Sequence, residues 1–136
     1  MLTLEQYWMK RDKAYASDLT DEIRENAAET VRRANLLLEK FYADRPNAVK
    51  RKVNSGWRPP AVNQKTKNAA PKSNHMLARA VDIGDQDGEL DKWLMTVSGQ
   101  NALEEIGLWM EHPSATPGWA HVQIVPPRSG KRVFYP

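Results

Sequence analysis

The longest periodic pattern of the chain lies in its first third, after Thr20. Apolar residues recur there at steps of three and four positions, which places them on one face of an α-helix. Thr20 is a suitable N-cap, and the carboxylates of Asp21 and Glu22 suit the positive end of the helix dipole. We therefore predict a helix that ends near Tyr42 and buries one stripe: Ile23, Ala27, Val31, Ala34, Leu38 and Phe41.

Two later segments alternate apolar and other residues, as half-buried strands do. In residues 80–84, Val81 and Ile83 should face the core, which turns Asp82 to the opposite face between two small neighbours. In residues 119–124, one face carries Ala120, Val122 and Ile124, and the other carries Trp119, His121 and Gln123. Asp82 and His121 are therefore both expected to point away from the core.

The remaining elements are shorter. We expect a helix after Thr3, a turn at 44–47, a strand over 49–57, and an antiparallel hairpin of strands 108–111 and 119–124 joined by loop 112–118. Helical spacing links Leu90, Trp93, Leu94 and Val97, a second short helix covers 102–106, and 131–135 suits an edge strand. The fold class is α+β, a small antiparallel sheet packed with helices. We expect one domain over 1–136, with a helical lead-in at 1–45 and a mixed remainder at 49–136.

Length and composition limit the class of protein to which this chain can belong. With 136 residues the chain is long enough to bury a hydrophobic core without stabilising cross-links. It has no cysteine, which excludes disulfides and thiol chemistry. The first residues lack the basic start and continuous apolar stretch of a signal peptide, and no segment is apolar enough to span a membrane. We expect a soluble protein, made in the host cytoplasm and not inserted into membranes.

Two of the three histidines lie in contexts that suit metal ligands. His75 is in a polar loop before the strand at 80–84, and Asp82 and His121 share the sheet face away from the core. Two imidazoles and one carboxylate leave a fourth position for water, which is the ligand count of a catalytic zinc site. The same ligands accept other divalent metals, so the ion is an expectation from ligand type.

The spacing of these residues resembles a known family. Ser73-x-His75-x-x-Ala78-x-Ala80-x-Asp82, followed by Trp119-x-His121, resembles the zinc D-alanyl-D-alanine carboxypeptidase and endopeptidase family, whose fold the hedgehog signalling domain shares. Upstream, Ser55-Gly56-Trp57-Arg58-Pro59-Pro60 and Asn63 resemble that family's Ser-Gly-aromatic-Arg motif. The resemblance covers about Val53 to Val125, and the flanking parts are similar to versions encoded by bacteriophages. Ala78 departs from the family, which usually has glycine there.

The resemblance implies roles for individual residues. One Zn²⁺ per chain would be held by His75, Asp82 and His121, and Arg58 would stabilise an oxyanion or hold a substrate carboxylate. The family's general base is an acidic residue upstream of the last histidine ligand. Glu111 is the nearest such carboxylate, with His112 as a weaker rival. Ser73, Trp119 and Gln123 are candidate substrate contacts.

The function that the resemblance implies is hydrolysis of peptide bonds in the stem or cross-link of bacterial peptidoglycan, by a monomer. Such a protein would act at the cell wall as an endolysin or as part of a virion. The alternative is a non-catalytic module with the same fold, used for wall binding or phage particle assembly. A basic segment, Lys50-Arg51-Lys52 with Lys65, Lys67 and Lys72, would suit an anionic polymer. We read it as a solvated surface and expect no nucleic-acid partner.

Overall fold

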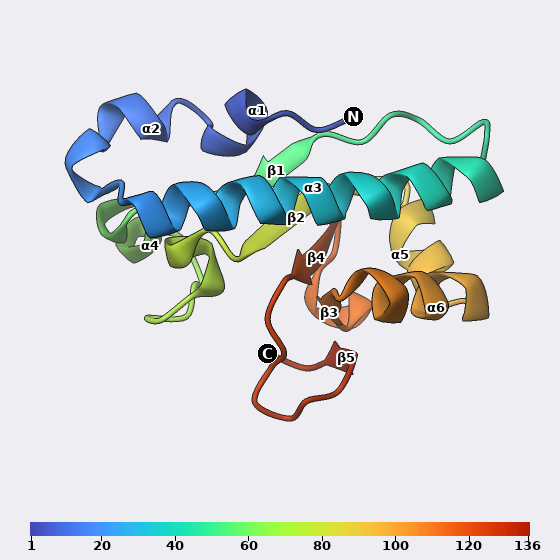
Figure 1. The fold of residues 1–136 in the computed structure, drawn as a ribbon. Coiled ribbons are helices and arrows are strands. Elements are labelled where there is room, and N and C mark those ends of the chain that lie inside the picture. Colours follow the sequence, from blue (N-terminus) through green and yellow to red (C-terminus); the bar gives the residue numbers. More distant parts are fainter.

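A five-stranded sheet forms the centre of the computed structural model, which describes residues 1–136 (Figure 1). The strands run in the spatial order β1-β2-β4-β3-β5, and all neighbours pair antiparallel except β5, which pairs parallel with β3. The structure therefore confirms the α+β class and the edge position of the last strand. The strands are β1 (Val53–Ser55), β2 (Ala80–Gly84), β3 (Trp109–Glu111), β4 (Trp119–Gln123) and β5 (Val133–Phe134).

The helices surround this sheet, and the longest, α3, lies across one face of it (Figure 1). None of them is both long enough and apolar enough to cross a membrane. The α-helices are α1 (Leu4–Trp8), α2 (Arg11–Ala14), α3 (Asp21–Asp44), α4 (Pro60–Lys65), α5 (Glu89–Leu94) and α6 (Val97–Ile106). Three short 3-10 helices are η1 (Ala16–Asp18), η2 (Asn74–Leu77) and η3 (Pro113–Ala115).

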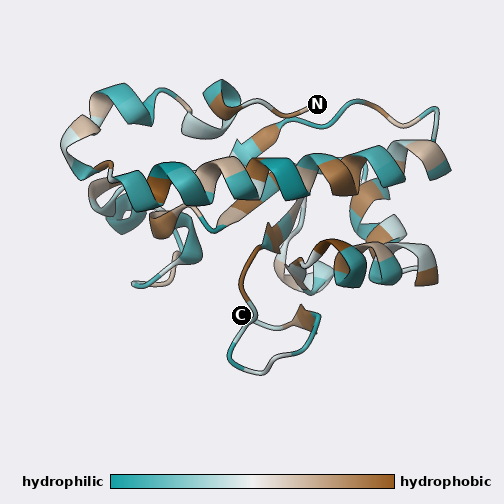
Figure 2. Cartoon of the chain, viewed as in Figure 1, coloured by the Kyte–Doolittle hydropathy of each residue, from teal (hydrophilic) through white to brown (hydrophobic).

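Helix α3 confirms the prediction from hydrophobic spacing. The Thr20 side chain accepts a hydrogen bond from the backbone N–H of Ile23, as an N-cap does, and the helix ends two residues beyond Tyr42. Every residue of the predicted stripe is buried, together with Thr30 and Leu37. Figure 2 shows these apolar positions recurring between hydrophilic ones along the helix. The stripe belongs to one hydrophobic cluster of 23 residues that also includes α1 and the sheet.

The register of β2 and β4 gives the sheet two different faces. Val81 pairs with Val122 and Ile83 with Ala120, and all four side chains are in the hydrophobic cluster. Because side chains alternate along a strand, the residues between them leave on the opposite face. Asp82 lies directly across from His121 on that second face, as the alternation predicted.

Two elements differ from the sequence prediction. The strand expected over 49–57 is confined to β1, because the backbone N–H of Arg51 donates to the Tyr42 hydroxyl and its guanidinium to the Asp87 carboxylate. Val97 does not continue the helix of Leu90 but begins α6, whose N-cap is Thr96, and Val97 is exposed. In both places a hydrogen-bonding side chain decides the boundary and overrides the apolar spacing.

Candidate metal centre

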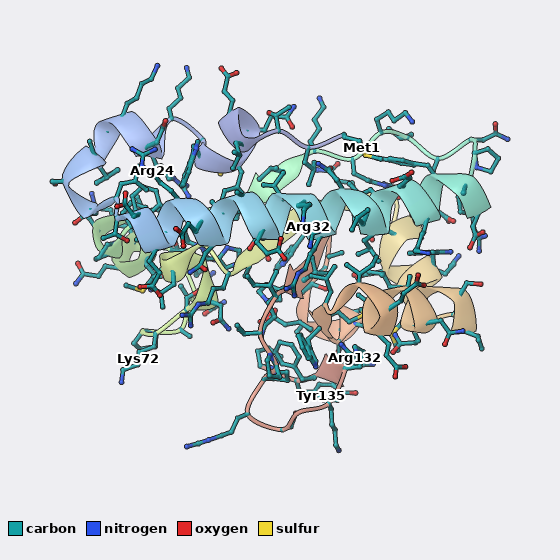
Figure 3. All side chains as sticks on the ribbon, viewed as in Figure 1. Met1, Arg24, Arg32, Lys72, Arg132 and Tyr135 are labelled. Carbon is teal, nitrogen blue, oxygen red and sulfur yellow. The ribbon has the colours of Figure 1, made fainter.

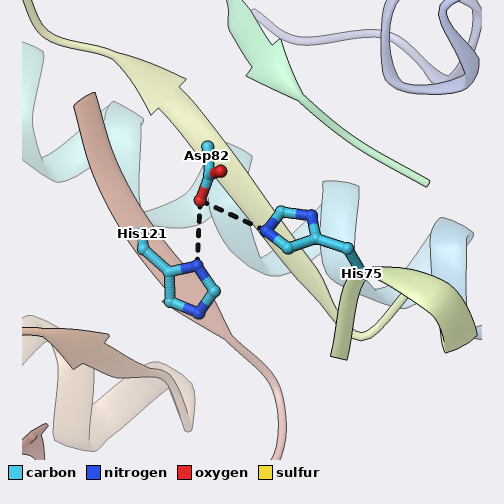
Figure 4. A group of neighbouring side chains, drawn as sticks. All are labelled: His75, Asp82 and His121. Carbon is cyan, nitrogen blue, oxygen red and sulfur yellow. Dashed lines mark hydrogen bonds and ion pairs between the residues drawn. The ribbon is translucent and has the colours of Figure 1, made fainter. Parts of the chain in front are cut away.

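His75, Asp82 and His121 meet on the polar face of the sheet (Figure 4). Asp82 Oδ1 lies 2.9 Å from His121 Nδ1 and 3.3 Å from His75 Nε2. One ligand atom from each residue lies within 4.8 Å of the others, and all three residues are buried. Ligand atoms of a tetrahedral zinc site are roughly 3.4 Å apart, so small side-chain rotations would close this group around an ion. The structure thus brings together all three predicted ligands.

Hydrogen bonds on the outer side of each imidazole select which nitrogen faces the group. His75 Nδ1 lies 2.8 Å from the Gly56 carbonyl oxygen, which only accepts, so Nδ1 carries the proton and Nε2 keeps its lone pair. His121 Nε2 lies 2.8 Å from Gln123 Oε1, which leaves His121 Nδ1 facing Asp82. Outer partners of this kind fix the tautomers of metal-binding histidines.

The unpaired lone pair of His75 is the clearest sign that the group could hold a cation. His75 Nε2 is buried and has no hydrogen-bond partner, and 3.3 Å away lies a carboxylate oxygen, Asp82 Oδ1, which is also an acceptor. Two buried acceptors that face each other repel unless a positive charge lies between them. The residues therefore fit a metal ion.

The charges of the group depend strongly on one another. Burial lowers the pKa of His75, so this imidazole stays neutral despite the nearby Asp82 carboxylate. For Asp82, burial acts to raise the pKa, but the neighbouring imidazoles of His75 and His121 outweigh it and hold the pKa below its usual range. For His121, burial acts to lower the pKa, and the hydrogen bond and charge of Asp82 outweigh it and raise the pKa. Asp82 is thus an anion and His75 is neutral, the states in which they bind metals, and His121 would release its proton when a metal ion binds.

The Ser-Gly-Trp-Arg segment fixes the loop that carries His75. Besides the Gly56 carbonyl, the Trp57 indole N–H donates to the Met76 carbonyl at 3.0 Å, and the Arg58 backbone N–H donates to the His75 carbonyl at 3.0 Å. Three consecutive residues of the motif therefore form hydrogen bonds with His75 and Met76 of η2. The sequence predicted a role only for the arginine side chain of this motif, but the motif also holds the loop of the metal ligand His75 through its hydrogen bonds.

Ala78 occupies a backbone conformation that favours glycine. Its φ is +57°, in the left-handed region, where it ends η2 between His75 and β2. The loop nevertheless returns to the sheet, because the Thr30 hydroxyl of α3 donates to the Ala78 carbonyl at 2.8 Å and the Ala78 methyl packs in the core. Alanine here keeps the turn that glycine would make, and His75 reaches the ligand group.

Arg58 lies beside the ligands but is only loosely bonded. Its Nη2 is 3.6 Å from Asp82 Oδ2, its Nη1 is 3.4 Å from Asn63 Oδ1, and its Nε is buried without a partner. Burial lowers the pKa of Arg58, opposed by the charges of Asp82 and Glu111. A guanidinium whose donors are so incompletely used can bond to an oxygen of a bound molecule.

Glu111 reaches the same face from β3. The pairing of Met110 with Val122 sets the register, and Glu111 Oε2 lies 3.8 Å from His121 Nδ1. Burial raises the pKa of Glu111, and the charge of His121 opposes this shift. The hairpin therefore places a half-buried carboxylate within reach of the ligand group.

A cleft of about 450 Å³ opens over the group. The three ligands, Arg58 and Glu111 line it, and so do Ser73 and Trp119. The Ser73 hydroxyl also accepts from the His75 backbone N–H at 3.1 Å and so caps η2. Two of the three predicted substrate contacts thus border the cleft.

Gln123 and His112 lie elsewhere. Gln123 does not line the cleft, and its side chain bridges His121 and the Val125 carbonyl. His112 also lies outside the cleft. Its ring forms a hydrogen bond with the Ser114 hydroxyl and stacks on Tyr135 at a centroid distance of 4.6 Å. Among the candidate bases only Glu111 faces the ligands.

The basic segment divides into different environments. Arg51 is buried and pairs with Asp87 at 2.8 Å, and the Lys50 ammonium lies 4.1 Å from the centre of the Tyr42 ring. These two cations are used within the fold. Lys67, by contrast, lines the cleft.

Comparisons of the chain with protein-family models, with curated proteins and with solved structures found no match.

Proposed function

We propose that this protein is a zinc-dependent peptidase that hydrolyses peptide bonds in bacterial peptidoglycan. The observation that carries the proposal is the buried, unpartnered Nε2 of His75, which faces Asp82 and His121 at the floor of the cleft. Three protein ligands that leave a further position free, beside a carboxylate and a guanidinium, are typical of a hydrolytic metal site.

His75 Nε2, His121 Nδ1 and Asp82 would hold the ion. A zinc ion there would lower the pKa of a bound water to about 7 and polarise a carbonyl group. The chain's own contribution is to turn His75 Nε2 and His121 Nδ1 toward the ion, through Gly56 and Gln123, and to bury the ligands. Zinc is favoured by the mixed nitrogen and oxygen ligand set, and other divalent ions remain competitors.

Glu111 would act as the general base. It lies on the cleft beside His121, and burial raises the pKa of its carboxyl group, which strengthens it as a proton acceptor. After it takes a proton from the attacking water, it can deliver that proton to the leaving amine. Arg58 would bond the carbonyl oxygen as negative charge develops there, or a carboxylate of the substrate.

The substrate class comes from the resemblance of three sequence blocks to the zinc D-alanyl-D-alanine peptidases. The structure supports this proposal through the ligand group, Arg58 and Glu111, which lie around one cleft. The bond that is cut, at the stem terminus or in the cross-link, is decided by which peptides fit the cleft.

The test is digestion of purified peptidoglycan by the zinc-loaded protein, with and without a chelator, with the released peptides read by mass spectrometry. We expect a defined fragment whose release the chelator abolishes. Glu111→Gln should abolish release while one zinc per chain stays bound, and Glu104→Gln, the same change at an exposed site on α6, should leave it intact. Zinc binding without release from several wall types would favour the non-catalytic module, and full turnover of Glu111→Gln would refute Glu111 as the base.

A further inference from the structure

One cation on the cleft has no role in the proposed chemistry. Lys67 follows α4, is exposed, and borders the same cleft as Glu111 and Trp119. Only two lysines form salt bridges, Lys40 with Glu105 and Lys92 with Glu89, and Lys67 is one of those that form none. An unpaired ammonium group at the mouth of a cleft is free to bind an anionic group of a ligand.

The loop that carries Lys67 is tied to Arg58. The Asn63 side chain is buried, its oxygen accepts from Arg58 Nη1 at 3.4 Å, and its amide donates to the Ala70 carbonyl at 2.9 Å. The Thr66 hydroxyl also donates to the Val62 carbonyl at 2.8 Å. Asn63 thus fixes the loop of residues 66–70 relative to the guanidinium, and the two cations border one cleft from connected positions.

The charges of the cleft favour an anionic ligand. Its ionisable lining consists of Arg58 and Lys67, the carboxylates of Asp82 and Glu111, and the two imidazoles. The two cations balance the two carboxylates, so a bound divalent metal ion would leave the cleft positive by the charge of that ion. Arg58 has contacts with Asp82 at 3.6 Å and with Asn63 at 3.4 Å, whereas Lys67 forms no salt bridge.

We propose that Lys67 is a specificity-determining residue: its ammonium group pairs with a free carboxylate of the bound peptide, so the cleft selects anionic peptides over their amidated forms. This inference rests on the proposed peptidase function and adds its substrate class. An exposed ion pair contributes at most about 1 kcal/mol, so the preference should be about two- to fivefold in affinity.

Equilibrium binding tests the inference with two synthetic stem pentapeptides. One has the α-carboxyl group of its D-glutamate free, and the other has a carboxamide there. Zinc-loaded Glu111→Gln is the parent, so that the peptides are not consumed. We expect the free acid to bind about two- to fivefold more tightly, and the difference to shrink at high salt, where exposed charges are screened.

Lys67→Gln in this parent should bind both peptides equally. Lys72→Gln is the matched control, because Lys72 is in the same connection between α4 and η2 but projects away from the body of the protein (Figure 3). A preference that persists in Lys67→Gln, or that is absent in the parent, would overturn the inference.

The two proposals fail differently. Chelator-sensitive hydrolysis of peptidoglycan together with an unchanged preference in Lys67→Gln would refute the role of Lys67 alone. A preference that depends on Lys67, without hydrolysis by the wild-type protein, would refute the peptidase and leave an anion-selective binding cleft. If neither peptide binds, both proposals are wrong.

Discussion

The side-chain oxygen of Gln123 lies 2.8 Å from His121 Nε2, two residues earlier in the same strand. Residues two apart in a strand face the same side, so both side chains lie on the face of the sheet opposite the hydrophobic face. The Gln123 amide nitrogen donates to the Val125 carbonyl at 2.9 Å, which turns the oxygen, not the nitrogen, toward the ring. Gln123 therefore holds the proton of a neutral His121 on Nε2 and leaves Nδ1 for a metal ion.

Gln123→Leu should weaken zinc binding. Leucine keeps the approximate size but removes the acceptor, so His121 loses the bond that fixes its tautomer and leaves a buried N–H unpaired. Loss of such an outer partner typically costs about 10- to 100-fold in metal affinity. The measurement is zinc competition against a chelating dye.

Gln123→Glu is the matched control, because a carboxylate also accepts from His121 Nε2. We expect it to retain most of the zinc affinity that leucine loses. Equal affinities for the wild-type protein and Gln123→Leu would show that the bond does not orient the ligand.

The sequence predicted this face of the sheet better than it predicted the contacts on it. Strand alternation alone put Asp82, His121 and Gln123 on one side, because a period of two leaves no other choice once Val81 and Val122 are buried. The hydrogen bond of Gln123 depends on its rotamer and on the path of the chain at Val125, which no periodicity encodes. A predicted substrate contact is thus bonded to a metal ligand instead.

Gly56→Ala should disturb the metal centre through His75. A Cβ at this position would overlap the backbone carbonyl of Tyr7, so either α1 or the Gly56 loop must move. The Gly56 carbonyl accepts from His75 Nδ1, and its displacement would release that ring. We expect a loss of about 1–3 kcal/mol in unfolding free energy from overpacking, with weaker zinc binding. Urea unfolding and zinc competition measure the two effects.

Gly84→Ala separates this mechanism from a general intolerance of larger residues. The nearest atom to a Cβ there is the Lys52 carbonyl oxygen at 3.5 Å, an ordinary contact, although Gly84 is in the same strand as Asp82. This variant should keep its zinc affinity. If Gly56→Ala also keeps it, the loop is not what positions His75.

The contact between Gly56 and Tyr7 could not be predicted from the sequence. The Ser-Gly-Trp-Arg motif was recognisable, and its glycine reads locally as part of a turn. Its actual neighbour is Tyr7, whose place beside the motif follows from the packing of the N-terminal segment in the common core. Neither the approach of Tyr7 nor that of the η2 loop has a local pattern, because both arise from contacts between distant segments.

Arg58→Lys should reduce hydrolysis although it preserves the charge. Lysine has no planar fork, so it cannot contact Asn63 and Asp82 from two nitrogens and still offer a donor to the substrate. We expect kcat/KM on a synthetic stem peptide to fall by at least about tenfold, since loss of one oxyanion donor typically costs 10²–10³. Arg24→Lys, at an exposed position of α3, is the control and should leave kcat/KM unchanged (Figure 3). Unchanged kinetics of Arg58→Lys would show that a point charge is sufficient.

Asp91→Asn should stabilise the protein at alkaline pH. Asp91 is 7% exposed, and its Oδ2 accepts from Thr116 while its Oδ1 has no partner. Burial, and secondly the charge of Asp85, raise the pKa of Asp91 to about 7. The folded protein therefore holds a proton between about pH 4 and 7 that the unfolded chain releases, so stability falls as the pH rises through this window and the loss is complete above it.

Asparagine is neutral at every pH, so a protein with asparagine at position 91 does not lose this stability as the pH rises. We expect Asp91→Asn to gain on the order of 1–3 kcal/mol in unfolding free energy at pH 8, and the gain to shrink toward pH 5. Asp87→Asn should act in the opposite direction, because the hydrogen bond from Arg51 lowers the pKa of Asp87 and stabilises its anion. Urea unfolding of the three proteins at pH 5 and pH 8 measures both signs. A gain for Asp91→Asn that does not depend on pH would mean that packing, and not the buried charge, limits stability at this position.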